Sequence, residues 1–308
     1  MRTERYCFKK ASILTERLIS YRIILMCHLK KGGKMNDSKV LKELAISIRK
    51  DIVECIASIG VGHIGGCLSI ADVLAVLYGK YMNIDPKNPK MEGRDRLVCS
   101  KGHAGPAVYS VLAEKGFFPK SELLTLNQGG TNLPSHCDMN KTPGIDMTAG
   151  SLGQGFSCAV GIALGSRIKK DGATIYAIIG DGESQEGQIW EAAMFAGNQG
   201  LDNLIAFTDY NKLQLDGTIE EINDVAPLAD KWKAFKWEVM SIDGHDVDAI
   251  DKAIEKAKTI KGKPKMIILN TVKGKGVSFV EAALVGCHSM SISAEQKESA
   301  LREIGGAK

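Results

Sequence analysis

The strongest constraint on the fold of this 308-residue chain is a repeated order of apolar strand, polar or glycine-bearing loop, and helix-like pattern. Alternation of this kind is typical of parallel strands joined by right-handed crossovers. We therefore predict an α/β fold, with a doubly wound, mainly parallel sheet and helices on both faces. The predicted strands are residues 96–100 (RLVCS), 174–179 (TIYAII), 203–211 (NLIAFTDYN), 237–243 (WEVMSID) and 266–272 (MIILNTV).

Two segments near the start of this domain have the spacing of helices. Apolar residues recur at helical intervals from Leu41 to Ile59, and Gly60 is expected to end that helix. The glycine loop GVGHIGG follows. A second apolar helix is predicted over residues 70–81, with Ser69 as its N-cap.

Residues 1–34 differ from the rest of the chain. They are basic and contain an apolar run from Ile19 to Cys27, which is too short to span a membrane. No small-residue cleavage pattern follows the run, which argues against a signal peptide. We interpret residues 1–34 as an extension or mis-assigned start before Met35, with a transit peptide as the alternative. The folded domain is then residues 35–308.

Composition narrows the functional classes. Forty Lys plus Arg against 36 Asp plus Glu leave a net charge of +4, with most of the excess at the two ends of the chain. No basic stripe indicates a nucleic-acid partner, and no membrane association is expected. The 8 cysteines show neither a C-x-x-C pair nor a metal-binding spacing, so a reducing, cytoplasmic location is expected.

Oxygen-bearing side chains follow two of the predicted strands. One strand ends in Gly180, Asp181 and Gly182, and the next ends at Asn211. The carboxyl ends of parallel strands meet at one edge of a sheet, where ligands bind in such folds. Magnesium prefers oxygen ligands and commonly shares a substrate's phosphates, so Asp181, Asn211 and a main-chain carbonyl near Leu213 form a candidate site. Either residue alone is more often an ordinary turn or strand end, so the prediction depends on the pair.

Other glycine-rich phosphate sites do not fit this chain. A dinucleotide fingerprint beginning at Gly180 would need glycine where Gln185 stands, and one beginning at Gly153 would need glycine in place of Cys158. No glycine loop is followed by the G-K-[ST] of a nucleotide-binding P-loop.

The segment GDG at 180–182, with Asn211 about thirty residues later, resembles the thiamine diphosphate signature of transketolase-type enzymes. Four further strings resemble successive transketolase motifs in the family's order: GHIGG around His63, SKGHAGPA around His103, LPSHCD around His136 and TAGSLGQG from Thr148. The resemblance covers residues 40–290. It corresponds to the first third to half of a full-length transketolase and is similar to the N-terminal subunit of the two-gene form.

The resemblance implies a role for each matched residue. It implies magnesium ligands at Asp181, Asn211 and the Leu213 carbonyl, diphosphate contacts at Gly182 and His103, and a loop under the cofactor's rings at Gly150 and Leu152. It implies catalytic roles for four histidines: His63, His103 and His288 beside the diphosphate and the reacting carbon, and His136 at the donor's C1 hydroxyl and carbonyl. It also implies that Glu186 and Glu191 join the two cofactor sites of a dimer through hydrogen bonds.

Several of these positions have an ordinary structural alternative. Glu186 and Glu191 lie where acidic residues favour the start of a helix without any further role. His245 and His28 are interpreted as ordinary loop residues, while Lys273 and Lys275 face either an anionic phosphate or solvent. The loop around His288 departs from the family, which usually has His-Gly there, whereas this chain has Cys287, His288 and Ser289. The sugar specificity is therefore open.

The function that the resemblance implies is reversible transfer of a two-carbon ketol unit from a ketose phosphate to an aldose phosphate, as in the pentose phosphate pathway. The cofactors would be thiamine diphosphate and Mg²⁺, or Ca²⁺ or Mn²⁺ in its place. The carboxylate that activates thiamine diphosphate in this family comes from a pyrimidine-binding domain absent from this sequence. We therefore expect the partner to be a transketolase C-terminal subunit, in a heterotetramer with two copies of each chain.

Besides a transketolase-like enzyme for an unusual sugar, three further alternatives remain open at this stage. One is the α subunit of a 2-oxoacid dehydrogenase, and another is a deoxyxylulose-phosphate synthase fragment, since both share the GDG and Asn pattern. Conversion of xylulose 5-phosphate rather than pyruvate would distinguish them from a transketolase. A third is a non-catalytic paralogue, which the intact metal ligands and matched histidines argue against.

Overall fold

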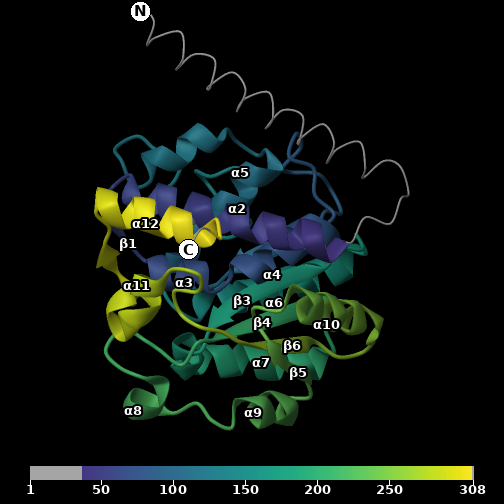
Figure 1. The fold of residues 1–308 in the computed structure, drawn as a ribbon. Coiled ribbons are helices and arrows are strands. Elements are labelled where there is room, and N and C mark those ends of the chain that lie inside the picture. Colours follow the sequence, from purple (N-terminus) through teal and green to yellow (C-terminus); the bar gives the residue numbers. More distant parts are fainter. Residues whose placement is uncertain (1–36, 307–308) are drawn as a thin grey trace, which may run out of the picture. The chain divides into compact units, whose positions relative to one another are not determined.

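The computed structural model of the chain describes residues 37–306, whose fold is drawn in Figure 1. The chain divides into two compact units, residues 1–40 and residues 41–308. Of the first unit, only residues 37–40 are described, and they form the first turn of helix α2. The prediction for residues 1–34 thus lies outside the described residues.

Within residues 37–306, five strands form a parallel sheet in the order β2-β3-β4-β6-β5. Their bounds are β2 (Arg96–Cys99), β3 (Ile175–Gly180), β4 (Leu204–Tyr210), β5 (Glu238–Asp243) and β6 (Lys265–Asn270). The five predicted strands and their parallel pairing are confirmed. A short antiparallel pair, β1 (Val61–Gly62) with β7 (Met290–Ser291), was not predicted.

Helices cover both faces of this sheet, which confirms the doubly wound arrangement. Their bounds are α2 (Asp37–Ala57), α3 (Ile64–Leu68), α4 (Ala71–Val76), α5 (Gly105–Lys115), α6 (Gln154–Lys169), α7 (Gly187–Gln199), α8 (Ile219–Asn223), α9 (Leu228–Ala234), α10 (Val247–Thr259), α11 (Ser278–Ala282) and α12 (Ala294–Ile304). In Figure 1, α4 and α5 lie on one side of the sheet, and α7 and α9 lie on the other.

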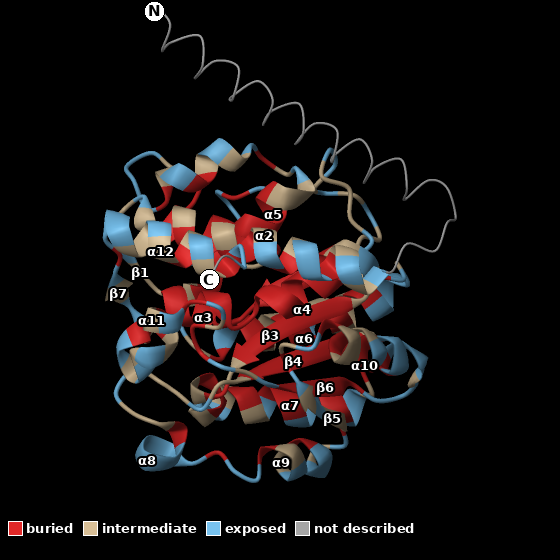
Figure 2. Ribbon diagram, viewed as in Figure 1, coloured by how far each residue is buried: buried red, intermediate tan, exposed pale blue. Residues whose placement is uncertain are grey.

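Alternate side chains of each strand enter two separate apolar cores. In β3, Tyr176 and Ile178 pack into the core with α4, α5 and α10, whereas Ala177 and Ile179 pack into the core with α6, α7 and α9. Parallel sheets are covered on both faces, so their strands are apolar throughout instead of alternating with polar residues. Figure 2 shows the central strands buried along their length.

The structure corrects the prediction for residues 60–81. The glycine loop carries β1 and then α3, and the predicted helix over residues 70–81 is divided into α4 and a π-helical turn (Leu77–Tyr81). Ser69 does not cap α4, because its hydroxyl donates instead to Asp209 in β4 at 2.7 Å. The segment Ile64–Tyr81 has the length and hydropathy of a membrane span, yet 83% of it is buried in the domain, as in a core helix.

Close backbone contact sets the position of α6 beside the end of β2. A Cβ atom added at Gly155, in the first turn of α6, would lie 2.8 Å from the Ser100 Cα atom. The Ser100 hydroxyl in turn accepts a hydrogen bond from the Phe156 amide at 2.8 Å. Glycine at this position therefore lets α6 approach the strand end that leads into the candidate site.

We expect Gly155→Ala to lower the free energy of unfolding by about 1–3 kcal/mol, the usual effect of overpacking a rigid contact. Gly161→Ala in the same helix is the matched control, since its Cβ would meet nothing within 4 Å. That substitution should be neutral or stabilise by up to about 1 kcal/mol, because alanine favours helices over glycine. Urea denaturation of both variants measures the difference, and equal stabilities would contradict the packing argument.

Candidate active site

A cavity of about 350 Å³ opens at the carboxyl ends of the strands. Loops after β2, β3, β4 and β6 contribute to it, together with segments that precede α3 and α6 and that follow α11. All but one of the predicted site residues line this cavity: His63, His103, His136, Gly150, Leu152, Asp181, Gly182, Glu186, Asn211, Leu213 and His288. Residues far apart in the sequence are thus brought to one place.

Glu191 is the predicted site residue that the structure does not bring to the cavity. It lies on the exposed face of α7, in a separate recess with the apolar side chains of Met194 and Phe195. Glu186 is also exposed, although it reaches the edge of the cavity. The hydrogen-bond network predicted for these two carboxylates between subunits remains a prediction.

Four histidines form a compact cluster in the cavity. The distances between ring centroids are 5.5 Å for His63 and His103, 5.6 Å for His63 and His136, 5.3 Å for His63 and His288, and 5.0 Å for His103 and His288. Among the described residues, no group of three or more His, Cys, Asp or Glu side chains is placed to hold a metal ion. Imidazole rings in such a cluster can hydrogen-bond to a ligand in the cavity and exchange protons with it.

The surroundings of these rings favour their neutral form. Burial lowers the pKa of His288 to about 4, with further contributions from the charges of Lys273, His63 and Lys101. Burial and the nearby Lys101 charge hold the pKa of His103 well below its usual value. Burial also lowers the pKa of His63 and of His136. Neutral imidazoles can both donate and accept hydrogen bonds, as handling of sugar hydroxyls requires.

Hard oxygen donors lie together on another wall of the cavity. The Asp181 carboxylate accepts hydrogen bonds from the main-chain amides of Gly182, at 2.8 Å, and Lys212. The Asn211 amide nitrogen donates to Asp209 at 2.9 Å, which identifies Oδ1 as the acceptor end of that amide. The carbonyl of Leu213 also lines the cavity.

This donor set fits a divalent cation of the magnesium type. Carboxylate, amide and carbonyl oxygens are the ligands that such an ion prefers, and phosphate oxygens or water commonly complete its octahedron. Burial and the charge of Asp209 raise the pKa of Asp181 to about 7. A bound cation would supply the counter-charge that this buried carboxylate otherwise lacks. The described residues therefore suit the metal that the sequence predicted.

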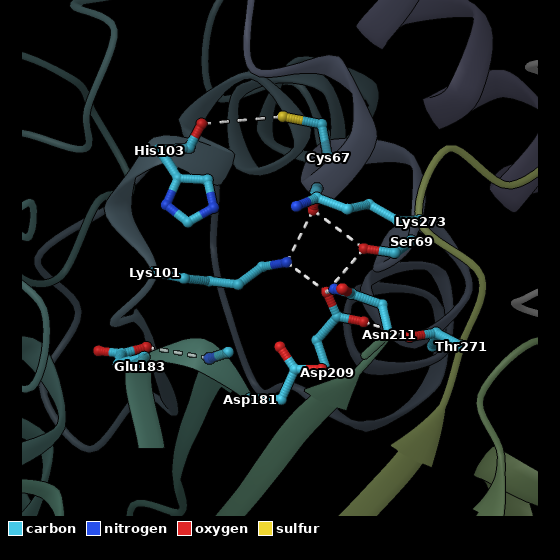
Figure 3. A network of polar contacts seen from close by, with 12 residues as sticks. Cys67, Ser69, Lys101, His103, Asp181, Glu183, Asp209, Asn211, Thr271 and Lys273 are labelled. Atoms are coloured by element: carbon cyan, nitrogen blue, oxygen red, sulfur yellow. Dashed lines mark hydrogen bonds and ion pairs between the residues drawn. The ribbon is translucent and has the colours of Figure 1, made fainter. Parts of the chain in front are cut away.

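Lys101 and Asp209 were not predicted, yet they form a buried ion pair beside the oxygen donors, with 2.5 Å between nitrogen and oxygen. Figure 3 shows the Lys101 ammonium beside the Asp209 carboxylate. The same ammonium also donates to the Gly66 carbonyl at 2.8 Å. Burial acts to raise the pKa of Asp209, but the Lys101 charge and hydrogen bonds from Lys101, Thr271 and Ser69 outweigh it and keep the pKa below its usual value.

Glu183 is a second buried acid that sequence reasoning missed. Its carboxylate accepts from the main-chain amides of Gly153 at 2.9 Å and Gly180 at 3.0 Å, and from the Ser100 hydroxyl. One side chain thereby ties together the ends of β2 and β3 and the start of α6. An acid two residues after Asp181 in a glycine-rich loop is the sequence signal for it, but the same pattern is common at helix starts.

The sequence left open whether Lys273 faces solvent or a ligand site, and the structure places it at the cavity. Its side chain is buried and faces the cavity, and its ammonium donates to the Leu213 carbonyl at 3.0 Å. The His288 Nδ1 atom lies 3.2 Å from the same nitrogen. Burial lowers the pKa of Lys273. Lys275 is not among the residues that line the cavity.

Residues 40–307 match the family model described as "Transketolase, thiamine diphosphate binding domain". The chain belongs to the transketolase family. The resemblance predicted from the motifs is confirmed, and so are the fold class and the enzyme class, a transferase.

Two relatives of similar length are named as transketolase subunits. The chain is 60% identical to the 6-deoxy-6-sulfo-D-fructose transketolase subunit SqwG of a Clostridium species, over 86% of this chain and 96% of that protein. It is 41% identical to an apulose-4-phosphate transketolase subunit of Phocaeicola vulgatus, over 83% of this chain and 90% of that protein. Both names agree with the prediction of one subunit of a two-chain transketolase.

Solved transketolases share the fold of this chain. The transketolase of Campylobacter jejuni superposes with a TM-score of 0.81 at 33% identity. The match covers 87% of this chain but only 43% of that protein, so this chain spans less than half of the solved transketolase. In this transketolase-family subunit, the roles of individual cavity residues remain predictions.

We expect the four cavity histidines to stay neutral at pH 7, because burial lowers the pKa of each ring and neighbouring lysines lower it further for His63, His103 and His288. Ring-resonance NMR of the chain should give His288 a titration midpoint near 4. Lys273→Met should raise that midpoint by removing a neighbouring positive charge. His136 is the internal control, since burial accounts for its lowered pKa. A midpoint for His288 close to 6.5 in the unmodified chain would contradict the electrostatic account.

Proposed function

We propose that this chain is the subunit that binds the thiamine diphosphate and Mg²⁺ of a two-chain transketolase, which reversibly transfers a two-carbon ketol unit from a ketose to an aldose phosphate. The observation that carries the proposal is the single cavity shared by Asp181, Asn211, the Leu213 carbonyl and four histidines. Ca²⁺ or Mn²⁺ could occupy the same oxygen donors. Family membership supports the cofactor, and the donor chemistry supports the metal.

The proposal gives the residues of this chain distinct tasks. When bound, thiamine diphosphate supplies the carbanion chemistry that no side chain provides. Asp181 and Asn211 would hold the metal, while Gly182 lets the backbone approach the diphosphate. His136 would orient the donor's carbonyl end. The neutral rings of His63, His103 and His288 would accept or donate protons at sugar hydroxyls.

We propose a sulfonated ketose, 6-deoxy-6-sulfo-D-fructose, as the donor. The relative that carries this sugar in its name is 60% identical to the chain, whereas the apulose-4-phosphate relative is 41% identical. Removing two carbons from the sulfofructose leaves a four-carbon aldose with its sulfonate at C4. The ketol unit then passes to an aldose phosphate, such as glyceraldehyde 3-phosphate, and extends it by two carbons. This donor replaces the pentose phosphate pathway sugars expected from the motifs.

We further propose that the active enzyme includes a C-terminal transketolase subunit, in a cytoplasmic assembly with two copies of each chain. Support comes from the naming of both relatives as transketolase subunits. The partner would supply the carboxylate that activates the cofactor's aminopyrimidine. The exposed Glu186 and Glu191 fit an interface in such an assembly.

Asp181→Ala should weaken Mg²⁺ and thiamine diphosphate binding together, by about 100-fold, because a buried charged ligand is removed. Asn211→Ala should act in the same direction but less severely. Asp230→Asn is the control, since this acid is exposed on α9, away from the cavity. Calorimetry of the complex with its partner measures both ligands, and an unchanged cofactor affinity in the Asp181 variant would refute the proposed site.

The reconstituted complex should use 6-deoxy-6-sulfo-D-fructose with a kcat/KM at least about tenfold higher than that for fructose 6-phosphate or xylulose 5-phosphate. Differences of this size arise when a site is built for one substrate head group. The assay measures by mass spectrometry how fast the four-carbon sulfonated aldose is released. A preference for xylulose 5-phosphate would contradict the donor assignment, and turnover of pyruvate instead would contradict the transketolase reaction itself.

A further inference from the structure

His245 lies outside the cavity, in the turn between β5 and α10, and none of the proposed chemistry uses it. Its mostly buried ring nevertheless has two polar partners. The Nε2 atom accepts a hydrogen bond from the Val272 main-chain amide at 2.8 Å, so that nitrogen carries no proton. The proton is therefore on Nδ1, which donates to the Asp72 carboxylate at 2.9 Å. These contacts select one neutral tautomer.

Asp72, on α4, is held by a second partner. Arg49 of α2 donates to both of its carboxylate oxygens, at 3.0 Å for the Nη1 contact, and both side chains are buried. Burial acts to raise the pKa of Asp72, but hydrogen bonds from His245 and Arg49 outweigh it and hold the pKa below its usual value. The carboxylate therefore remains a charged acceptor that fixes the His245 ring.

The cluster of His245, Asp72 and Arg49 contacts both ends of the turn at residues 272–275. The first amide of the turn donates to His245, and its last carbonyl accepts from the Arg49 Nε atom at 3.2 Å. Between these points, the Gly274 amide donates to the Gly65 carbonyl at 3.0 Å. Three contacts, each with a different segment of the chain, therefore determine the path of this turn.

Lys273 lies within this turn, and its side chain points into the cavity. It is only 4% exposed, and its ammonium reaches both the Leu213 carbonyl and the His288 ring. A lysine side chain has many rotamers, so holding its ammonium at one point costs conformational entropy. That cost is lower when the backbone of the lysine is already ordered. The cluster behind the turn provides that fixed backbone.

We propose that His245, through its hydrogen bond to the Val272 amide, is a positioning residue that keeps the Lys273 ammonium in the active-site cavity. The Arg49–Asp72 ion pair holds the His245 ring in the required tautomer. The functional consequence rests on the function proposed above, in which the cavity takes anionic ligands. The structural consequence, a turn that loosens when the ring is lost, stands independently of that function.

Three substitutions separate the two contacts of the ring. His245→Ala removes both hydrogen bonds. A glutamine amide reaches the position of Nε2, so His245→Gln retains an acceptor for the Val272 amide. An asparagine amide reaches only the position of Nδ1, so His245→Asn retains a donor to Asp72 but loses Val272. The glutamine and asparagine variants are therefore a matched pair that differ in the contact under test.

Two measurements on the full chain, without sugar or partner, report the turn directly. Val272 is 43% exposed, so protection of its amide from hydrogen exchange depends on the bond to His245. Exchange should be about tenfold faster in the Ala and Asn variants and close to the unmodified rate in the Gln variant. Acetylation of Lys273, read by mass spectrometry, should follow the same order, while acetylation of the exposed Lys252 should not change.

In the complex with its partner, the Ala and Asn variants should lose about tenfold in kcat/KM, and the Gln variant should lose less. The proposal is overturned if Val272 exchange and Lys273 labelling in the Asn variant match those in the Gln variant. It is also overturned if the turn loosens but turnover is unaffected. A complex of unmodified chains that transfers no ketol unit would refute the proposed function, while the exchange and labelling results would still decide the structural part.

Discussion

Lys101 and Asp209 form an ion pair with side chains 2% and 0% exposed, and the cavity is arranged around this pair. Lys101 follows β2 and Asp209 lies in β4, with β3 between them. Removing two charges from water costs several kcal/mol for each ion, and a close partner repays this only when the remaining polar atoms are also satisfied. Here they are satisfied by the Gly66 carbonyl and by the side chains of Ser69, Asn211 and Thr271.

The same pair divides the cavity into two electrostatic regions. The Asp209 charge raises the pKa of Asp181, in addition to burial, and so creates a position that a cation stabilises. The Lys101 charge acts in the opposite direction on the histidines, since it adds to burial in lowering the pKa of His103 and His288. The oxygen donors near Asp181 could therefore hold a cation while the imidazoles of His103 and His288 stay neutral.

Much of the fold could be predicted from the sequence because buried parallel strands leave a local signal. Runs such as residues 174–179 are apolar on both faces, and their order with helices determines the fold class. Asp181 and Asn211 could be placed together for a related reason, because the carboxyl ends of parallel strands share one edge. The four histidines of the predicted site lie in one cavity. The neutral state of their rings depends on burial, which the sequence does not show.

The features that were missed depend on contacts between distant residues. Lys101 and Asp209 are 108 positions apart and have ordinary local contexts, a glycine loop and a strand interior. Their pairing follows from the strand order β2-β3-β4, which sequence patterning does not determine. The local pattern at Ser69 predicts a helix cap, but the buried Asp209 carboxylate is the stronger hydrogen-bond partner. The contacts of His245 likewise leave no local signal, so the sequence predicts only an ordinary loop residue there.

We propose that Asp181, Asn211 and the Leu213 carbonyl form one metal site that holds the cofactor's diphosphate. The most direct test is a crystal structure of the two-chain complex grown with thiamine diphosphate and Mn²⁺ in place of Mg²⁺, with the ion located by anomalous scattering. We expect one strong peak within about 2.0–2.3 Å of all three oxygen ligands and of diphosphate oxygens. A peak elsewhere, or a diphosphate bound away from these three residues, would contradict it.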